Sequence, residues 1–447
     1  MITTPVILAA GKGTRMKSSL PKVLHPLLGK PLVHYAIQAV SALAQEKPVL
    51  VVGHKAELIK NALGDRCRYV HQDQLLGTGH AVQQAEGLLR GKSDQVLVTN
   101  ADMPLIRPGT LQELVEAQEE HSGPITMLTL EVENPRGFGR VIRNEEGAVQ
   151  AIREETAASP QELEIKELNS AMYCFSADWL WEALGEVELS QKGEYYLTDL
   201  VQIAVEQGET VRAIKSRQPK ELIGINTRVH LAEAGSILRD WVNRGLMTAG
   251  VSMPDPQAVY VEPGVEIGRD TTLFPGTHLQ GMTVIGESCT IGPGTIIRDS
   301  RVADGCKIQN SVLEGAVLEE GVDVGPFSHL REGAHLARGV HIGNFGEIKN
   351  SYLGQGTKMG HFSYLGDAQL GREVNVGAGT ITCNYDGRQK HQTVVGDQVF
   401  LGSDTMLVAP VELGKGSRTG AGSVVTRDIG PEKLALGVPA REIKNTE

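Results

Sequence analysis

A six-residue repeat runs through the second half of the chain. From about residue 251 glycine is dense, and apolar residues recur every six positions in three runs: Ile267, Leu273, Leu279, Ile285, Ile291 and Ile297; then Leu318, Val324, Leu330, Leu336, Ile342 and Ile348; then Val395, Leu401, Leu407 and Leu413. A sustained period of this length predicts a β-helix, in which each hexapeptide forms one side of a triangular coil and its apolar residue points to the axis. The repeat alone does not distinguish an enzyme from an inert scaffold.

The first half has a different texture. Residues 1 to about 225 alternate short apolar strands, such as 49–52 and 96–98, with helical periodicity at 32–43 and 111–118. Strands that alternate with helices predict an α/β domain with a Rossmann-like, mostly parallel sheet and helices on both faces. Ligands bind such sheets at the carboxyl ends of the strands. Between 227 and 248, apolar residues at helical spacing predict one linker helix.

Length, charge and cysteine usage limit the class of protein. The chain has 447 residues, which predicts more than one domain, and we divide it into 1–226, 227–248 and 249–447. Its net charge of −11 argues against generic nucleic-acid binding. Five scattered cysteines without a C-x-x-C pair favour reduced thiols in a cytoplasmic protein. We see no signal peptide and no apolar stretch of membrane-spanning length, so we expect no membrane insertion.

A glycine loop follows the first apolar strand. Residues 8–16 read L-A-A-G-K-G-T-R-M, and Pro21-Lys22 comes shortly after them. Glycines let the backbone turn sharply and point its N–H groups at an anion, and Arg15 and Lys22 add two positive charges. A dinucleotide fingerprint would need glycine where Met16 stands, and a Walker loop is absent from the sequence. A bare G-x-G is also consistent with an ordinary strand-to-helix turn.

The full string is more specific than its glycines. It resembles the signature of sugar-1-phosphate nucleotidyltransferases, which join a sugar phosphate to a nucleotide. The resemblance implies that Leu8, Ala9, Ala10 and Gly11 bind the nucleotide and that Arg15 and Lys22 act in catalysis. Catalysis of this reaction consists of positioning the reactants and neutralising their charge. Because the phosphate nucleophile is already ionised, we assign no general base.

Asp102 ends the strand at 96–101, where a carboxylate is well placed to hold Mg²⁺ against phosphates. On position alone, a turn or N-cap aspartate is an equal interpretation. The resemblance favours the metal, because the family has a metal-binding Asp after this strand and a second ligand, Asn, at the close of the domain. Asn226 matches that place, although by itself it would be interpreted as a helix cap.

Other positions are implied as contacts to base and sugar. Gln72, Gly77 and Thr78 lie in a glycine-containing loop that allows close approach to a flat base, or that simply caps the helix beginning near His80. Further along, the family's sugar-contacting positions correspond to Gly139, Glu154 and Asn169. Around Asn169 this chain reads N-S-A-M, where the family more often has N-T-G. Uridine rather than thymidine rests on the resemblance.

Charged residues interrupt the β-helix repeat. Arg331 and Lys349 differ by 18 positions, which is one coil, so they stack on one face. Two adjacent cations repel each other unless an anion lies between them. That anion is either a bound sugar phosphate or a neighbouring carboxylate such as Glu332 or Glu347. His361 belongs to a different face and reaches the pair around a corner or across a subunit contact. The spacing of six between His329, His335 and His341 puts them on three sides of the coil, where they cannot form one metal site.

The repeat is interrupted again between Val376 and Val395, where Asn384-Tyr385-Asp386-Gly387 indicates a turn. A loop that leaves a regular coil usually covers or builds a site. Here the whole chain resembles the bacterial bifunctional N-acetylglucosamine-1-phosphate uridyltransferase/glucosamine-1-phosphate acetyltransferase family. The matched strings are Leu330-Arg331, Ile348-Lys349-Asn350, Gly360-His361, Tyr364–Asp367, Gly377–Thr380, Cys383–Gly387 and Gly402-Ser403-Asp404.

The resemblance implies a left-handed β-helix, a homotrimer with acetyl-transfer sites at subunit contacts, and two reactions. Glucosamine-1-phosphate is acetylated by acetyl-CoA, and the product is then uridylylated by UTP with Mg²⁺. His361 corresponds to the family's general base. The amino-sugar phosphate would be held by Arg331, Lys349, Tyr364, Asn375, Asn384 and Tyr385, and coenzyme A by Ala378, Ser403 and Ala421. Some members have a basic residue where Gly437 stands, and Arg441 is a candidate substitute.

Two other functions are compatible with parts of the sequence. A monofunctional nucleotidyltransferase would use the coil only to oligomerise or to regulate. A non-enzymatic interaction subunit would have the same two-part architecture without activity. His361 and the stacked cations argue against the first alternative, and the set of Arg15, Lys22 and Asp102 argues against the second.

Overall fold

The computed structural model describes residues 1–133, 135 and 137–445. The chain forms two compact units, residues 1–238 and 239–447, which are described separately below. Helix α9, Arg228–Thr248, contains the boundary between them and corresponds to the linker helix expected at 227–248. No helix in the described part of the chain is long and apolar enough to cross a membrane. All five cysteines are free thiols.

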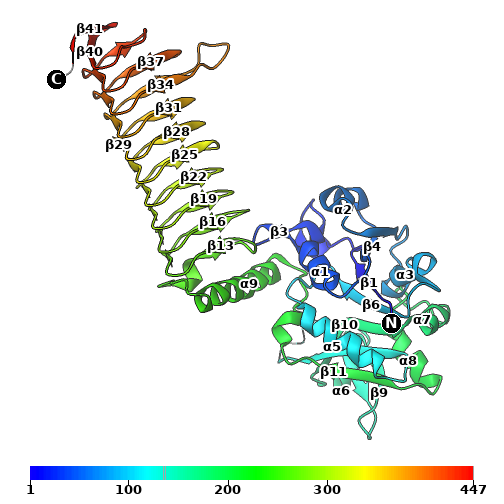
Figure 1. The fold of residues 1–447 in the computed structure, drawn as a ribbon. Coiled ribbons are helices and arrows are strands. Elements are labelled where there is room, and N and C mark those ends of the chain that lie inside the picture. The colour runs from blue at the N-terminus through cyan, green and yellow to red at the C-terminus, as the bar shows by residue number, and fades with distance from the viewer. Residues whose placement is uncertain (134, 136, 446–447) are drawn as a thin grey trace. The chain divides into compact units, whose positions relative to one another are not determined.

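A mostly parallel sheet forms the centre of the first unit, as the sequence predicts (Figure 1). Its order is β11-β7-β10-β6-β1-β4-β5, and β8 and β9 form a hairpin beside β10. Along this order neighbours pair in parallel, except that β10 runs antiparallel to β6 and β7. The strands are β1 Thr3–Leu8, β4 Val49–Val52, β5 Arg68–His71, β6 Gln95–Asn100, β7 Ile125–Glu131, β8 Arg140–Arg143, β9 Val149–Arg153, β10 Glu167–Ser176 and β11 Val211–Lys215.

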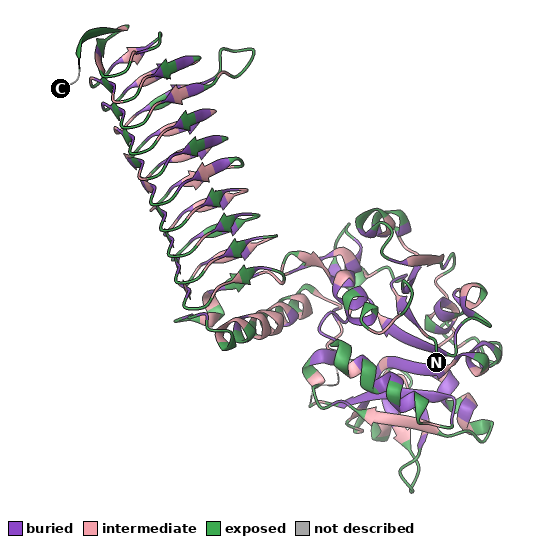
Figure 2. Ribbon diagram, viewed as in Figure 1, coloured by how far each residue is buried: buried purple, intermediate pink, exposed green. Residues whose placement is uncertain are grey.

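Helices cover both faces of this sheet. Successive residues of β1 point to opposite faces, so Val6 packs in one apolar cluster and Ile7 in another. The first cluster includes residues of α3, α7 and α8, and the second includes residues of α1, α2 and α5. The buried strands are therefore enclosed between two layers (Figure 2). The helices are α1 Leu32–Ser41, α2 Ala56–Leu63, α3 Thr78–Gln83, α4 Glu86–Leu89, α5 Pro108–Glu119, α6 Pro160–Leu163, α7 Ala177–Ala183 and α8 Asp199–Glu206.

Three parallel sheets wind around one axis in the second unit (Figure 1). Each sheet takes every third strand, for example β24-β27-β30-β33, β25-β28-β31-β34 and β26-β29-β32-β35. This is a parallel β-helix and is consistent with the left-handed form. The strands used in the text are β24 His329–Leu330, β25 Ala334–Leu336, β26 His341–Asn344, β27 Glu347–Lys349, β28 Ser351–Leu353, β29 Lys358–His361, β30 Tyr364–Gly366, β31 Ala368–Leu370, β32 Asn375–Val376, β33 Ile381–Cys383, β34 Thr393–Val395, β35 Phe400–Leu401 and β36 Met406–Val408.

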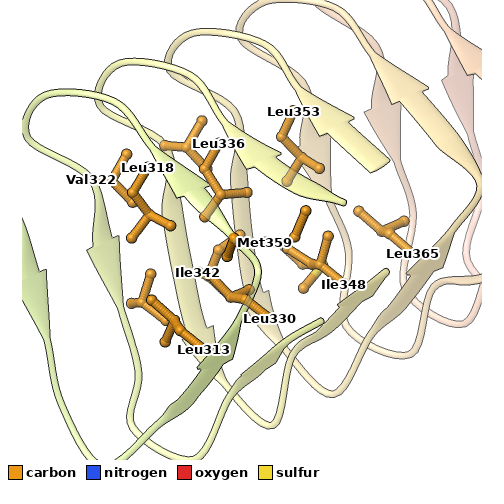
Figure 3. Close-up of a cluster of buried hydrophobic side chains, with 14 of the residues drawn as sticks. Leu313, Leu318, Val322, Leu330, Leu336, Ile342, Ile348, Leu353, Met359 and Leu365 are labelled. Atoms are coloured by element: carbon orange, nitrogen blue, oxygen red, sulfur yellow. The ribbon is translucent and has the colours of Figure 1, made fainter. Parts of the chain in front are cut away.

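The repeating apolar residues fill the axis of the coil. Leu330, Ile348 and Leu365 stack in register on consecutive coils, and all three are fully buried (Figure 3). The number of residues per coil varies, since Ile297 pairs with Leu313, 16 positions on, while Leu330 pairs with Ile348, 18 positions on. This shortening explains why the strict six-residue series lapses between Ile297 and Leu318.

The C-terminal part of α9 closes the first coils of the second unit. Val242, Leu246 and Met247 pack against the β-helix core. Asn243 donates from Nδ2 to the carbonyl oxygens of Pro256 (2.7 Å) and Val259 (3.0 Å). The helix therefore covers apolar residues that an open end of the coil would expose.

The second interruption of the repeat is shorter than the sequence analysis predicts. Strand β33 pairs with β30 and β36, so the coil continues through Ile381–Cys383. The inward position of β33 is Thr382, which is 1% exposed, and a polar residue there hides the repeat from an apolar pattern. The extra residues are 384–392, between β33 and β34, which we call the 384–392 loop. At the C-terminal end, β40 Lys433–Gly437 and β41 Ala440–Asn445 form an antiparallel hairpin.

Candidate active sites in the two units

A pocket of about 580 Å³ lies at the carboxyl ends of β1 and β6 in the first unit. Its walls include ten of the predicted residues: Leu8, Ala9, Ala10, Gly11, Lys22, Gln72, Gly77, Thr78, Asp102 and Glu154. Residues from four separate stretches of the sequence thus meet in one place. Parallel strands bring this about because their carboxyl ends lie along one edge of the sheet.

Two glycines allow the loops around the pocket to pack closely. Gly13 has a φ of 61°, and a Cβ built on it would lie 2.6 Å from Cβ of Lys22. Gly77 has a φ of 100°, and its Cβ would lie 2.5 Å from the carbonyl oxygen of Tyr195. Any larger residue at either position would displace a neighbouring segment of the pocket wall.

The predicted cations and metal ligands converge beside the pocket. Lys22 forms an ion pair with Asp102 and donates to Oδ1 of Asn226 (3.2 Å). Arg15 donates to the same Oδ1 from Nη2 (2.9 Å). The amide of Ile225 donates to the carbonyl oxygen of Asp102 (2.9 Å), which ties the end of the domain to the end of β6.

The geometry assigns the capping bond of α9 to a residue other than Asn226. At the start of α9, Oγ1 of Thr227 accepts from the amide of His230 (3.2 Å), so Thr227 makes the capping bond. Oδ1 of Asn226 instead accepts from two cations, as described above. An amide oxygen and a carboxylate around one positive group match the oxygen ligands that Mg²⁺ takes with substrate phosphates.

Burial changes the chemistry of Glu154. The pKa of its carboxyl is raised, chiefly because burial disfavours the charged form, while a hydrogen bond from Thr198 Oγ1 (3.2 Å) acts in the opposite direction. Gln72 is 3% exposed and donates from Nε2 to the carbonyl oxygen of Gly77 (3.0 Å). Thr78 accepts through Oγ1 from the amide of Leu197 (3.0 Å). Hydrogen bonds within the protein therefore fix the positions of Glu154, Gln72 and Thr78.

Four predicted residues do not line the pocket in this structure: Arg15, Gly139, Asn169 and Asn226. The side chain of Asn169 donates from Nδ2 to Tyr173 Oη (2.7 Å). Its main-chain N–H donates to the carbonyl oxygen of Gly139 (2.9 Å). The two positions predicted to contact sugar are thus neighbours of each other. The pairing of β10 with β7 shifts register between Asn169 and Tyr173. Within this stretch Ala171 has a φ of 58°.

The sequence analysis missed several residues that line the same pocket: Lys12, Asn100, Glu194 and Tyr196. Lys12 stands between the two loop glycines, and Asn100 ends β6, so their positions offered a signal. Glu194 and Tyr196 belong to no recognisable motif. They reach the pocket because a hydrogen bond from the Tyr195 amide to the Leu76 carbonyl oxygen (2.7 Å) holds their segment against the 72–78 loop.

In the second unit, the predicted stacking of Arg331 and Lys349 is confirmed. Their strands β24 and β27 pair in register, and the Arg331 amide donates to the Ile348 carbonyl oxygen (2.8 Å). Arg331 also forms an ion pair with Glu347 (2.8 Å), one of the two carboxylates that the sequence offered as its partner. Arg331 is therefore partly neutralised from its own sheet.

A third cation, Lys390, completes this group and was not foreseen. The pKa of Lys349 is lowered chiefly because Lys390 lies close to it, and Arg331 adds to the effect. Lys390 comes from the 384–392 loop, so its approach to Lys349 depends on how that loop folds. Glu347 pairs with Arg331, and the Asp367 carboxylate acts on Lys349, so the three positive groups exceed these two carboxylates and favour an anion.

Gly366 leaves room for side chains beside these cations. A Cβ on Gly366 would lie 2.3 Å from Tyr364 Oη and 2.8 Å from Asn384 Nδ2. Asp367 accepts from Nδ2 of Asn384 (2.5 Å) and from Nδ2 of Asn350 (2.6 Å). The predicted sugar-phosphate residues Tyr364 and Asn384 therefore meet over Gly366, while Asn375 lies in the neighbouring sheet on β32 and Tyr385 is exposed on the loop.

His361 lies in the sheet next to the cations, as predicted, at the end of β29. Register pairs Met359 with Val376 and Val376 with Leu401, so the positions two residues on, Ala378 and Ser403, lie level with His361 on successive coils. Main-chain bonds from Asp404 to Ala378 (2.6 Å) and from Gly422 to Ser403 (2.8 Å) continue the column toward Ala421. We call this column the small-residue edge.

His329, His335 and His341 lie on three different sheets, as their spacing requires. Each faces a carboxylate of the preceding coil, His329 with Glu314 and His335 with Glu319. No group of three or more His, Cys, Asp or Glu side chains arranged for a metal occurs among the residues that the structure describes. The Gly437 position lies in the terminal hairpin opposite Ala440, and Arg441 lies opposite Leu436.

The two units define a sugar-phosphate nucleotidyltransferase joined to a hexapeptide-repeat β-helix. Residues 5–197 match the family model described as "MobA-like NTP transferase domain". The chain is 46% identical to the "Bifunctional protein GlmU" of Pelobacter propionicus over 96% of this chain and 95% of that protein. The proteins of the same name from Syntrophomonas wolfei (46% identity; 98% and 97% covered) and Heliobacterium modesticaldum (44%; 99% and 96%) are similar over the same extent.

The chain belongs to the bifunctional GlmU family. This confirms the resemblance drawn from the sequence motifs, and it identifies the chain as a bifunctional transferase of UDP-N-acetylglucosamine biosynthesis, with acetyltransferase and uridylyltransferase activities. Full-length similarity to proteins called bifunctional argues against a coil that serves only as a scaffold and against a non-enzymatic subunit.

Proposed function

We propose that residues 249–447 acetylate glucosamine-1-phosphate, that residues 1–226 uridylylate the product, and that 227–248 link the two. The observation that carries this assignment is the convergence of predicted residues within each unit. Ten line one pocket in the first unit, and the cation group lies one sheet away from His361 in the second. Substrates are small molecules, namely the two sugar phosphates, acetyl-CoA and UTP.

Acetyl transfer would begin at the glucosamine amine. Its nitrogen attacks the thioester carbonyl carbon of acetyl-CoA, His361 accepts the amine proton, and the coenzyme A thiolate leaves. Arg331, Lys349 and Lys390 would bind the sugar phosphate, with Tyr364, Asn384, Asn375 and Tyr385 around the sugar. Ala378, Ser403 and Ala421 would contact coenzyme A, since an edge of small residues allows an extended ligand to lie close to the coil.

Uridylyl transfer would take place in the first unit. A phosphate oxygen of N-acetylglucosamine-1-phosphate attacks the α-phosphorus of UTP in line, and pyrophosphate leaves. Arg15 and Lys22 would neutralise charge on the phosphates once nucleotide replaces their contacts with Asn226. Asp102 and Asn226 would hold Mg²⁺, which supplies further charge neutralisation when bound. Gln72, Gly77 and Thr78 would orient the base, and Gly139, Glu154 and Asn169 the sugar.

We also propose a homotrimer in the cytoplasm, with no nucleic-acid partner. Phe327, Phe345 and Phe362 stack along one corner of the coil beside His361, with ring centroids 5.6 and 5.0 Å apart. They are 50–62% exposed, and a continuous apolar strip of this kind is typical of a protein interface. Five free thiols support a reducing compartment. Sedimentation that finds a fully active monomer would contradict the trimer.

The test is a coupled assay. The protein is incubated with glucosamine-1-phosphate, acetyl-CoA, UTP and Mg²⁺, and UDP-N-acetylglucosamine is measured by mass spectrometry. We expect the wild type to form it and His361→Ala to form it only from N-acetylglucosamine-1-phosphate. EDTA should abolish uridylylation and spare acetylation. If the wild type itself needs the acetylated sugar, the proposed role of the coil is wrong.

A further inference from the structure

Asn344 lies beside His361 on the preceding coil. We propose that Asn344 is a positioning residue for acetyl transfer: it fixes the His361 ring in the tautomer with the proton on Nδ1, which leaves Nε2 free to accept the amine proton. This inference rests on the proposed role of His361 as the general base. The carboxamide oxygen of Asn344 and Nδ1 of His361 are 2.8 Å apart.

The two residues are held level by the coil itself. Strands β26 and β29 pair in parallel, and Asn344 is the register partner of His361. Each residue is preceded by a glycine and followed by a phenylalanine, in Gly343-Asn344-Phe345 and Gly360-His361-Phe362. A Cβ on Gly343 would lie 2.0 Å from the carbonyl oxygen of Gly360, so the backbones approach closely at this point.

Contacts on either side restrict movement of the pair. Phe345 and Phe362 stack with centroids 5.0 Å apart and planes at 18°. Ser363 donates from Oγ to the carbonyl oxygen of His361 (2.8 Å). The hydrogen bond between Asn344 and His361 therefore joins side chains whose backbones are already fixed, which reduces the entropy lost when it forms.

The carboxamide of Asn344 determines which nitrogen of the His361 ring carries the proton. A carboxamide oxygen can only accept, so Nδ1 of His361 must donate and Nε2 keeps its lone pair. An amide is also neutral, so it favours the imidazolium form less than a carboxylate would. A carboxylate at position 344 would hold a proton on Nε2 to higher pH, and a general base needs that site empty.

Ionisable neighbours do not replace Asn344 in this role. The positions level with His361 on the adjoining coils are Asn344 and Ala378, which do not titrate. His341 on β26 is paired with Asp323 (2.9 Å), and Glu347 on β27 is paired with Arg331. The remaining ionisable residues on the strands next to the ring are Lys349 in β27, Lys358 in β29 and Tyr364 in β30.

The first experiment reads the tautomer without reference to activity. ¹⁵N NMR of the histidine rings is recorded for the full-length protein and for Asn344→Ala, and the His361 signals are assigned from their loss in His361→Ala. We expect the Nδ1–H form in the wild type and a shift toward the Nε2–H form in Asn344→Ala. A wild-type His361 that carries its proton on Nε2 overturns the inference.

The second experiment measures acetyl transfer against pH, from release of the coenzyme A thiol. Asn344→Ala should lower kcat about tenfold, as expected for one lost hydrogen bond, with KM for acetyl-CoA unchanged. Asn344→Asp should retain activity at high pH and move the acid limb of the profile upward. Uridylylation and the thermal unfolding curve should be unchanged in both variants, which shows that the first unit and the β-helix are both folded.

Superimposable profiles for the wild type, Asn344→Ala and Asn344→Asp overturn the positioning role. Failure of the proposed function gives a different result. If His361→Ala acetylates at the wild-type rate, His361 is not the base and the catalytic consequence drawn for Asn344 falls with it. The NMR comparison still decides the hydrogen bond independently in that case.

Discussion

Glu154, which we propose contacts the sugar, shows how burial of a carboxylate costs stability. Its carboxyl has a raised pKa because burial disfavours the charge, and the nearby Asp199 carboxyl, whose pKa burial also raises, adds repulsion. The folded state therefore holds the proton to higher pH than the unfolded state. Stability is unaffected below the ordinary value of 4.5 and falls as pH rises through the folded-state pKa.

Glu154→Gln should stabilise the first unit at pH 7. The amide carries no charge to desolvate and can still accept from Thr198 through its oxygen. We expect Tm to rise by about 2 °C at pH 7 and the difference to vanish below pH 4.5. If Glu154 contacts the sugar as proposed, uridylylation kcat/KM should fall about tenfold or more, since a charged hydrogen-bond acceptor is lost. Calorimetry at both pH values checks the first part, and a gain that persists at acid pH would exclude this cause.

Ala171 occupies a conformation that suits glycine. Its φ is 58°, and the chain departs here from the N-T-G pattern that the family more often has. The left-handed region costs a residue with a Cβ roughly 1–2 kcal/mol, and glycine loses about 0.5–1 kcal/mol more chain entropy on folding. The side chains of Asn169 and Asn100 contact Ala171 through its main-chain N–H and carbonyl oxygen, which glycine keeps.

Ala171→Gly should therefore raise the free energy of unfolding by about 0.5 kcal/mol, or Tm by roughly 1–2 °C. Urea denaturation of the variant and the wild type measures the difference. Gly245→Ala in α9, where a Cβ would meet nothing within 4 Å, serves as a matched control for the reverse change in a helix. A loss of stability in Ala171→Gly would mean that packing of the methyl group outweighs the strain.

At the scale of elements, the 384–392 loop depends on Asp386. Its Oδ1 accepts from the amides of Arg388 (2.7 Å) and Gln389 (2.8 Å), and Oδ2 faces His391 (2.7 Å). These bonds lower the pKa of Asp386 to about 2, the amide of Gln389 contributing most. Their contribution is present above the ordinary value of 3.8 and is lost as pH falls toward 2.

Asp386→Ala should loosen the loop, withdraw Lys390 from Arg331 and Lys349, and displace Asn384 from its place beside Tyr364. We expect KM for glucosamine-1-phosphate to rise about tenfold and loop amides to exchange hydrogen faster, while uridylylation is unchanged. Asp386→Asn keeps an acceptor for the two amides, so its effect should be smaller. Equal KM values in the wild type and Asp386→Ala would show that the loop is held by other contacts.

The loop also illustrates what a pattern can and cannot locate. Its turn was predictable from Asn384–Gly387, and its place in the coil was predictable to within a few residues. Its true start was not, because Thr382 is a polar residue at an inward position and breaks the apolar series. The sequence did not predict the approach of Lys390 to Lys349 either, since this approach depends on the path of an irregular segment.

At the scale of the whole molecule, each unit has its own core, and the proposed function gives each unit its own site. Two inactive variants should therefore complement each other. Asp102→Ala keeps the acetylation site, and His361→Ala keeps the uridylylation site, so a mixture should convert glucosamine-1-phosphate to UDP-N-acetylglucosamine after a lag. Each variant alone should form none. A mixture that stays inactive, although each variant retains its own half-reaction, would mean that the intermediate does not pass through solution.

The sequence by itself determined the architecture and the chemistry of the parts. A six-residue repeat specifies a coil because each turn repeats the same local geometry, and register then stacks Arg331 on Lys349 without further information. Likewise, alternating strands and helices specify a mostly parallel sheet, and the glycine loop after the first strand, with its neighbouring cations, predicts a phosphate site. These conclusions need only neighbours in sequence or a fixed period.

Only the tertiary structure decided which side chains meet. Lys22 reaches Asp102 and Asn226, Thr227 rather than Asn226 makes the capping bond of α9, and Asn344 faces His361. It also decided the raised pKa of Glu154, which depends on how deeply the carboxyl is buried. The physical reason is the same in each case: hydrogen bonds and desolvation depend on distances of a few ångströms between segments far apart in sequence, and no local pattern encodes those distances.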